Sequence, residues 1–86
     1  MKFQGSVITE QNITFGIVIV KPHVLNIESE RGDMFRFGRR AFGSMPIILM
    51  AQDSSGTPTY YGRKDIVAFL ANLHPSQIPW KEYELD

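Results

Sequence analysis

The clearest concentration of chemically capable side chains is the run Tyr60-Tyr61-Gly62-Arg63-Lys64. Tyr60 and Tyr61 are expected at the end of a strand, where successive side chains point to opposite faces, so that one ring enters the core and the other faces solvent. Arg63 and Lys64 then fall at the start of a helix, where the helix dipole disfavours cations. A helix N-terminus with two basic side chains and an exposed phenol can hold a phosphate or a carboxylate. The competing interpretation is that both basic side chains extend into water.

Three arginines, Arg36, Arg39 and Arg40, form a second basic group on one face of a predicted helix. Near Tyr60 or Tyr61 such a face can contact a phosphate backbone while a base stacks on the ring. However, nine basic side chains balance nine acidic ones, and no RNA-binding signature is present, so a solvated helix face is the simpler interpretation. A ligand site, if the chain has one, is expected where the tyrosines meet the last helix, beside these arginines.

His23 is the candidate acid–base group, because it follows a predicted central strand, a position where sites in α/β sheets often form. The other histidine, His74, comes at the predicted end of the last helix, where a cation has a sufficient structural reason to be. Two histidines without ligand spacing and a complete lack of cysteine predict no metal site, disulfide or thiol nucleophile. No cofactor is expected either, because no cofactor-binding motif is present.

Two hairpins are expected to position these side chains. Residues 3–9 and 13–20 predict the first, and its second strand should be central because it is apolar on both faces. Residues 44–52 and 57–62 predict the second, closed by the turn-forming residues 53–56. After the last helix, Ile78 and Trp80 should pack on the body, and residues 81–85 can add a short edge strand.

Residues 26–43 are compatible with a helix or with a third hairpin that turns at residues 30–33. The helix is preferred, since the apolar side chains gather on one face, opposite the arginines. We expect an irregular start with Ser29 or Asp33 as the N-cap, and an end at Gly43. A second helix, of about three turns, is predicted by apolar residues at positions i, i+3, i+4 and i+7, namely Ile66, Phe69, Leu70 and Leu73.

The order of elements predicts an α+β fold in a single small domain over residues 1–86: β-β-α-β-β-α, with two helices and a mixed or antiparallel sheet of four to five strands. A chain of 86 residues is expected to build only one core. It lacks a hydrophobic signal segment and an apolar run of about 18 residues, so a cytoplasmic location without membrane association is expected.

The leading functional hypothesis is a protein-interaction or assembly module without catalytic activity, which associates with itself or a partner through a sheet edge or an aromatic surface. Its basis is an aromatic content of 12% in a chain with few catalytic groups. The first alternative is binding of an anionic ligand or nucleic acid through the basic and tyrosine-bearing surface. The second is a small enzyme that uses His23 or a tyrosine; the sequence leans against an enzyme without deciding the question.

Overall fold

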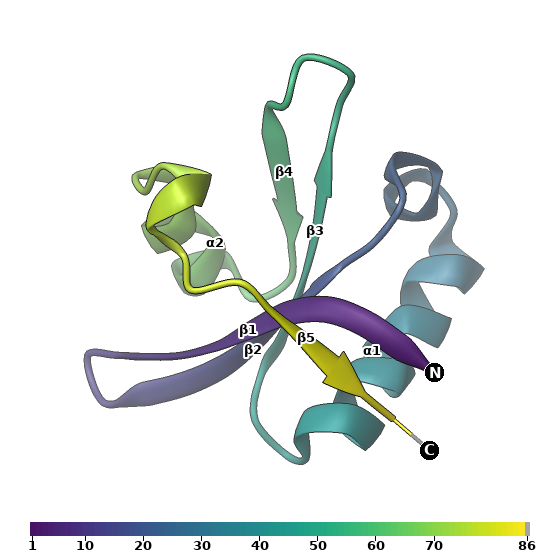
Figure 1. The fold of residues 1–86 in the computed structure, drawn as a ribbon, viewed down its shortest axis with the longest axis horizontal. Helices are drawn as coiled ribbons and strands as arrows, with labels where there is room; N and C mark the ends of the chain where they lie inside the picture. The colour runs from purple at the N-terminus through teal and green to yellow at the C-terminus, as the bar shows by residue number, and fades with distance from the viewer. Residues whose placement is uncertain (86) are drawn as a thin grey trace.

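The computed structural model describes residues 1–85 and consists of a strongly twisted five-stranded sheet with one α-helix on each face (Figure 1). The elements are β1 (Lys2–Glu10), β2 (Ile13–Ile19), the 3-10 helix η1 (Pro22–Asn26), α1 (Glu28–Phe42), β3 (Ile47–Gln52), β4 (Pro58–Tyr61), α2 (Lys64–Ala71), the 3-10 helix η2 (Pro75–Gln77) and β5 (Lys81–Glu84). The α+β fold and the β-β-α-β-β-α order are confirmed.

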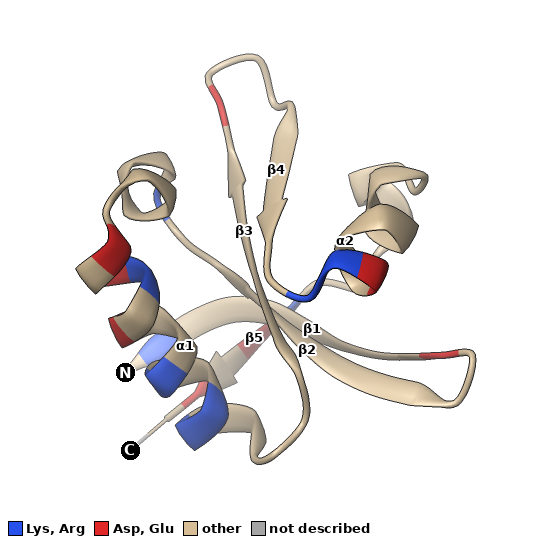
Figure 2. Cartoon of the chain, turned by 180° about the vertical axis from the view of Figure 1, so that it is seen from behind, with Lys and Arg blue, Asp and Glu red and all other residues tan. Residues whose placement is uncertain are grey.

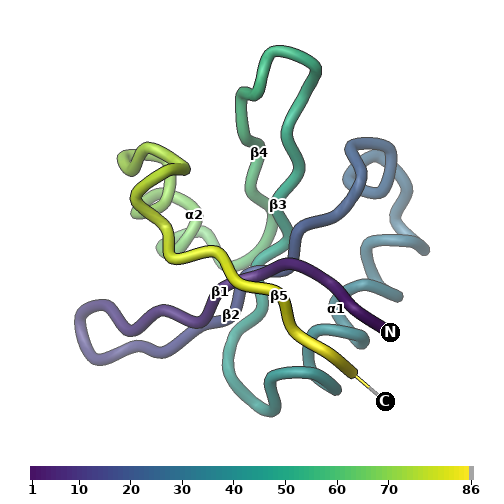
Figure 3. The backbone as a smooth tube through the Cα atoms, viewed as in Figure 1, coloured from purple at the N-terminus to yellow at the C-terminus, as the bar shows by residue number. Residues whose placement is uncertain are grey.

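The strands lie in the order β4-β3-β2-β1-β5, so β2 is central, as its apolar sequence predicted. β2 and β3 are parallel and are joined by a crossover through η1 and α1, whereas all other neighbours are antiparallel. The sheet is therefore mixed. The backbone trace shows both hairpins (Figure 3), and the amino group of Met1 donates to the carbonyl of Leu85, so β1 and β5 bring these two residues together.

Alternate residues of the two inner strands supply the two halves of the core. Ile17 and Val18 are neighbours on β2, and both are completely buried, because one faces α2 and the other faces α1. The buried residues on the α2 side are Phe15, Ile17, Ile48, Met50, Ile66, Leu70 and Ile78. Those on the α1 side are Val18, Val20, Val24, Ile47, Leu49 and Ala51.

Residues 28–42 form one regular helix, which excludes the alternative hairpin. The prediction of an irregular start and of Ser29 or Asp33 as the cap is wrong. The N-cap is Ile27, which makes no side-chain capping bond and is also the residue that ends η1. The chain thus enters α1 directly from η1, an element that was not predicted from the sequence. Gly43 ends α1 as predicted, with a φ of 89° and its N–H donating to the carbonyl of Arg39 at 2.9 Å.

The helix α2 has eight residues, fewer than predicted, and Leu73 lies beyond its end while still packing on the core. The segment after it returns to the body. Ile78 is buried, and the indole N–H of Trp80 donates to the carbonyl of Pro75 at 2.9 Å. The expected short edge strand follows as β5, paired to β1. None of the helices within residues 1–85 is long and apolar enough to span a membrane.

Candidate functional site

Tyr60 and Tyr61 lie on opposite faces of the sheet, as neighbours on a strand must. Tyr60 pairs with Met50 and packs against the α2 half of the core. Its hydroxyl oxygen is buried and has no hydrogen-bond partner among residues 1–85, and burial raises the pKa of the phenol. Tyr61 is 43% exposed on the α1 side, where its ring centre lies 6.1 Å from that of Phe35. The two phenol rings therefore lie on opposite sides of the sheet.

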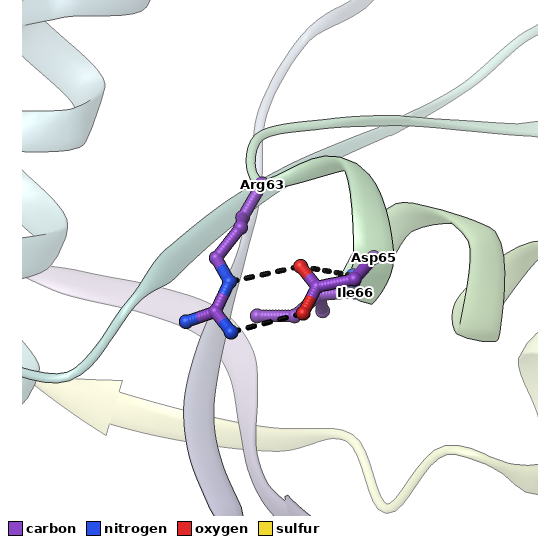
Figure 4. Close-up of polar contacts among 3 residues, drawn as sticks. All are labelled: Arg63, Asp65 and Ile66. Atoms are coloured by element: carbon purple, nitrogen blue, oxygen red, sulfur yellow. Dashed lines mark hydrogen bonds and ion pairs between the residues drawn. The ribbon is translucent and has the colours of Figure 1, made fainter.

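The Arg63 side chain is already engaged by a neighbouring carboxylate. Its Nε and a terminal nitrogen donate to the two carboxylate oxygens of Asp65 at 2.8 and 2.9 Å (Figure 4). The same carboxylate accepts the backbone N–H of Ile66 at 3.0 Å. The hydrogen bond from Arg63 is the main cause that lowers the pKa of Asp65. An anion supplied by the chain thus occupies the helix start, where an external phosphate or carboxylate was expected.

The arginines of α1 are spread along the length of the helix (Figure 2). Arg36 forms an ion pair with Asp33 one turn earlier on the helix. Arg39 and Arg40 are exposed in the last turn, where the helix dipole favours cations. At 1.5 Å per residue, Arg39 lies about 12 Å along the helix axis from Arg31, the cation that covers Tyr61.

Arg31 is the basic residue that the structure brings over the ring of Tyr61, and it was not among the site residues predicted from the sequence. Its guanidinium carbon lies 4.6 Å from the centre of the Tyr61 ring. One of its terminal nitrogens donates to the carbonyl of Leu25 at 2.7 Å. The available signal was the spacing of Arg31 and Phe35, which are four residues apart and so lie on one helix face. Both of these residues contact Tyr61.

His23 lies on η1 and is exposed. Its Nε2 is 3.5 Å from a carboxylate oxygen of Glu30, and it borders a hollow of about 660 Å³ between β1, η1 and α1. His74 is not at the end of α2; its Nδ1 accepts the N–H of Ser76 and caps η2. Among residues 1–85, no three or more histidine, aspartate or glutamate side chains are grouped so that they can hold a metal ion.

A groove of about 410 Å³ runs between β4 and α2, and it unites three of the predicted site residues: Tyr60, Tyr61 and Lys64. The helix contributes a stripe at positions i, i+3, i+4 and i+7, namely Lys64, Val67, Ala68 and Ala71. This stripe differs from the buried one, in which Ile66 and Leu70 face the sheet. Because two of its members are alanines, the helix leaves space beside the strand.

One wall of the groove is β4, the last strand of the sheet on that side. Gln52 pairs with Pro58, and proline has no N–H, so this position must be a non-hydrogen-bonded pair of the ladder. The N–H of Asp53 donates to the carbonyl of Thr57 at 3.1 Å, in agreement with this alternation. The N–H and C=O groups of Tyr60 therefore point away from β3, toward the open edge.

On the opposite side of the sheet, β5 covers β1 over Lys2–Gly5 and is itself protected. β5 has four residues, three of which are charged: Lys81, Glu82 and Glu84. Charged side chains on a short edge strand discourage pairing with another chain. β4 is equally short and begins with Pro58, which also limits pairing, but its four residues, Pro58-Thr59-Tyr60-Tyr61, carry no charge. Of the two terminal strands, β4 is therefore the one whose charge permits a further strand.

Comparison with protein-family models, with curated proteins and with solved structures finds no match of any of the three kinds.

Proposed function

We propose that this protein is a protein-interaction module that binds an extended segment of a partner protein at β4. The observation that carries this proposal is the uncharged open edge of β4, with the backbone groups of Tyr60 facing outward beside a groove. A partner strand can gain main-chain hydrogen bonds from such an edge and selectivity from pockets for its alternate side chains.

A segment of a partner suits this edge better than a second copy of the chain. Pro58 has no N–H, so β4 offers any added strand a single outward backbone donor, that of Tyr60. Two four-residue edges paired across a two-fold axis form only a short contact, whereas a stable interface typically buries roughly 1,200 Å² or more. An isolated extended segment can contact both the strand and the stripe on α2, because no folded body accompanies it into the groove.

The alternative ligand, a phosphate or nucleic acid, finds less support in the geometry. Arg36 and Arg63 are paired with Asp33 and Asp65. The ring of Tyr61, a platform on which a base would stack, is covered by Arg31 of the chain itself. The basic residues therefore do not converge on an exposed aromatic ring.

Selection from a random heptapeptide library displayed on phage tests the proposal. The library is panned on the protein, and recovered peptides are titrated against Ala71→Trp, which fills the groove, and against Asn72→Trp. Both positions are exposed, and Asn72 faces the hollow on the other side of α2. We expect peptides that bind the parent protein and Asn72→Trp but lose affinity for Ala71→Trp.

Two results would overturn the proposal. One is a selection that yields no peptide, or only peptides that bind Ala71→Trp as well as they bind the parent. The other is a stable dimer in light scattering that Ala71→Trp dissociates and Asn72→Trp leaves intact, because the edge would then belong to a second copy.

A further inference from the structure

We infer that the segment bound at β4 carries a carboxylate that pairs with Lys64, and apolar side chains that occupy the space over Val67, Ala68 and Ala71. The inference rests on the proposed function and specifies the chemical class of the partner: an extended peptide with an acidic residue in an apolar context.

The groove between β4 and α2 carries a positive charge. Lys64 is the only charged residue among those that line it, and within residues 1–85 it forms no ion pair. The neighbouring cation and anion, Arg63 and Asp65, neutralise each other. The groove therefore presents one uncompensated positive charge, at the end where α2 begins, and no carboxylate with which a ligand's acidic group would compete.

The part of the groove beyond Lys64 is apolar and has room for larger side chains. Beyond Lys64, the helix presents Val67, Ala68 and Ala71, so the rest of this wall is apolar and built mainly of small side chains. Small residues on the protein leave room for larger aliphatic ones on the ligand. Burying these removes apolar surface from water, which is the main favourable term in most associations between proteins.

The spacing of the wall fixes the order of the ligand's side chains. Lys64 and Ala68 are four residues apart, which is about 6 Å along the helix axis. An extended strand rises about 3.3 Å per residue and turns alternate side chains to the same face, so two positions span about 6.6 Å. An acidic residue at one position and an aliphatic residue two positions away thus fit Lys64 and Ala68 together.

A charge exchange tests this inference. The heptapeptide library is panned separately on the parent protein, on Lys64→Glu and on Lys21→Glu, a control that changes an exposed lysine outside the groove by the same charge. We expect Asp or Glu at one fixed position relative to aliphatic residues with the parent and with Lys21→Glu. With Lys64→Glu, that position should change to Lys or Arg.

A synthetic peptide from the parent selection and its Glu→Gln counterpart give the quantitative readout. An exposed ion pair of ordinary strength predicts a preference for the Glu peptide of roughly two- to fivefold, lost or reversed with Lys64→Glu. Peptides that bind in the groove with no acidic preference, or that keep it with Lys64→Glu, would overturn this inference while leaving the interaction module standing. The absence of any groove-dependent peptide would overturn both.

Discussion

The guanidinium carbon of Arg31 lies 4.6 Å from the centre of the Tyr61 ring, so that a residue of α1 covers a residue of the edge strand β4. This contact joins the crossover helix to the strand that we assign to ligand binding, and it holds the outward-facing ring of Tyr61 against the body. We expect it to stabilise the β4 edge.

A double-mutant cycle with Arg31→Ala and Tyr61→Leu measures this contact. The cycle is needed because Arg31 also donates a hydrogen bond to the carbonyl of Leu25, which Arg31→Ala removes as well. This loss is the same with either residue at position 61, so it cancels in the coupling free energy. A cation over an aromatic ring at a partly exposed site contributes about 0.5–1 kcal/mol. Urea denaturation of the four proteins should show coupling of that size; additive effects would mean that the two side chains do not stabilise one another.

Tyr60→Phe should leave stability unchanged or increase it by up to about 1 kcal/mol, because a buried hydroxyl without a partner carries an uncompensated desolvation cost. Most core substitutions reduce stability, so the expected sign is informative. Denaturant midpoints of the two proteins provide the measurement. A loss of more than 1 kcal/mol would show that the hydroxyl makes a hydrogen bond.

Two glycines of α1 should respond to alanine in opposite directions. A Cβ at Gly38 would lie 2.6 Å from Cγ2 of Ile47, whereas one at Gly32 would meet only the end of the Arg36 side chain at 3.5 Å. Gly32→Ala should stabilise the protein by about 0.5–1 kcal/mol through helix propensity. Gly38→Ala gains the same stabilisation from helix propensity, but overpacking against Ile47 costs about 1–3 kcal/mol, so this variant should be less stable than the parent. Equal thermal shifts in the two variants would contradict the close approach of α1 to β3.

Asp53 should make the β3–β4 turn sensitive to acid. Its carboxylate accepts bonds from the Ser55 hydroxyl at 2.7 Å and from the Ser55 and Thr57 N–H groups, each at 2.9 Å. The Ser55 hydroxyl, followed by the Thr57 N–H, lowers the pKa of Asp53 from 3.8. A lowered pKa means that the stabilisation is present above pH 3.8 and is lost as the pH falls through the folded-state pKa.

When the pH is lowered from 5 to 2, the urea midpoint should consequently decrease less in Asp53→Ala than in the parent protein. Ser54→Ala, at a neighbouring turn position whose side chain makes no hydrogen bond within residues 1–85, is the control and should behave like the parent. Identical acid sensitivity in all three proteins would remove the assigned role of the Asp53 carboxylate.

Local sequence patterns were sufficient for most of the fold. The apolar runs at 13–20 and 45–52 have no polar alternation, which is why they could be assigned to inner strands of the sheet. The N-cap of α1 could not be obtained in this way. Ser29 and Asp33 are good capping residues, but η1 delivers the chain to Ile27, so α1 begins before either of them.

The candidate site was predictable in position more than in chemistry. The sequence drew attention to the tyrosines and to the basic residues after them, and Tyr60, Tyr61 and Lys64 do line one groove. Which cation remains unpaired depends on side-chain conformation: Asp65 engages Arg63, and Lys64 forms no ion pair within residues 1–85. The contact between Arg31 and Tyr61 joins residues that are distant in sequence, so it depends on the crossover that brings α1 against β4.

Amide hydrogen exchange at Tyr60 tests the central claim most directly. In the protein alone, the Tyr60 amide should exchange rapidly, whereas those of Thr59 and Tyr61 should be slow because the ladder alternation points them toward β3. A selected peptide at saturating concentration should markedly slow hydrogen exchange of the Tyr60 amide. Exchange of the amides along the outer edge of β1 beyond Gly5 should remain unchanged. Binding that leaves Tyr60 exchange unaltered, or that protects the edge of β1 instead, would contradict the addition of a partner strand at β4.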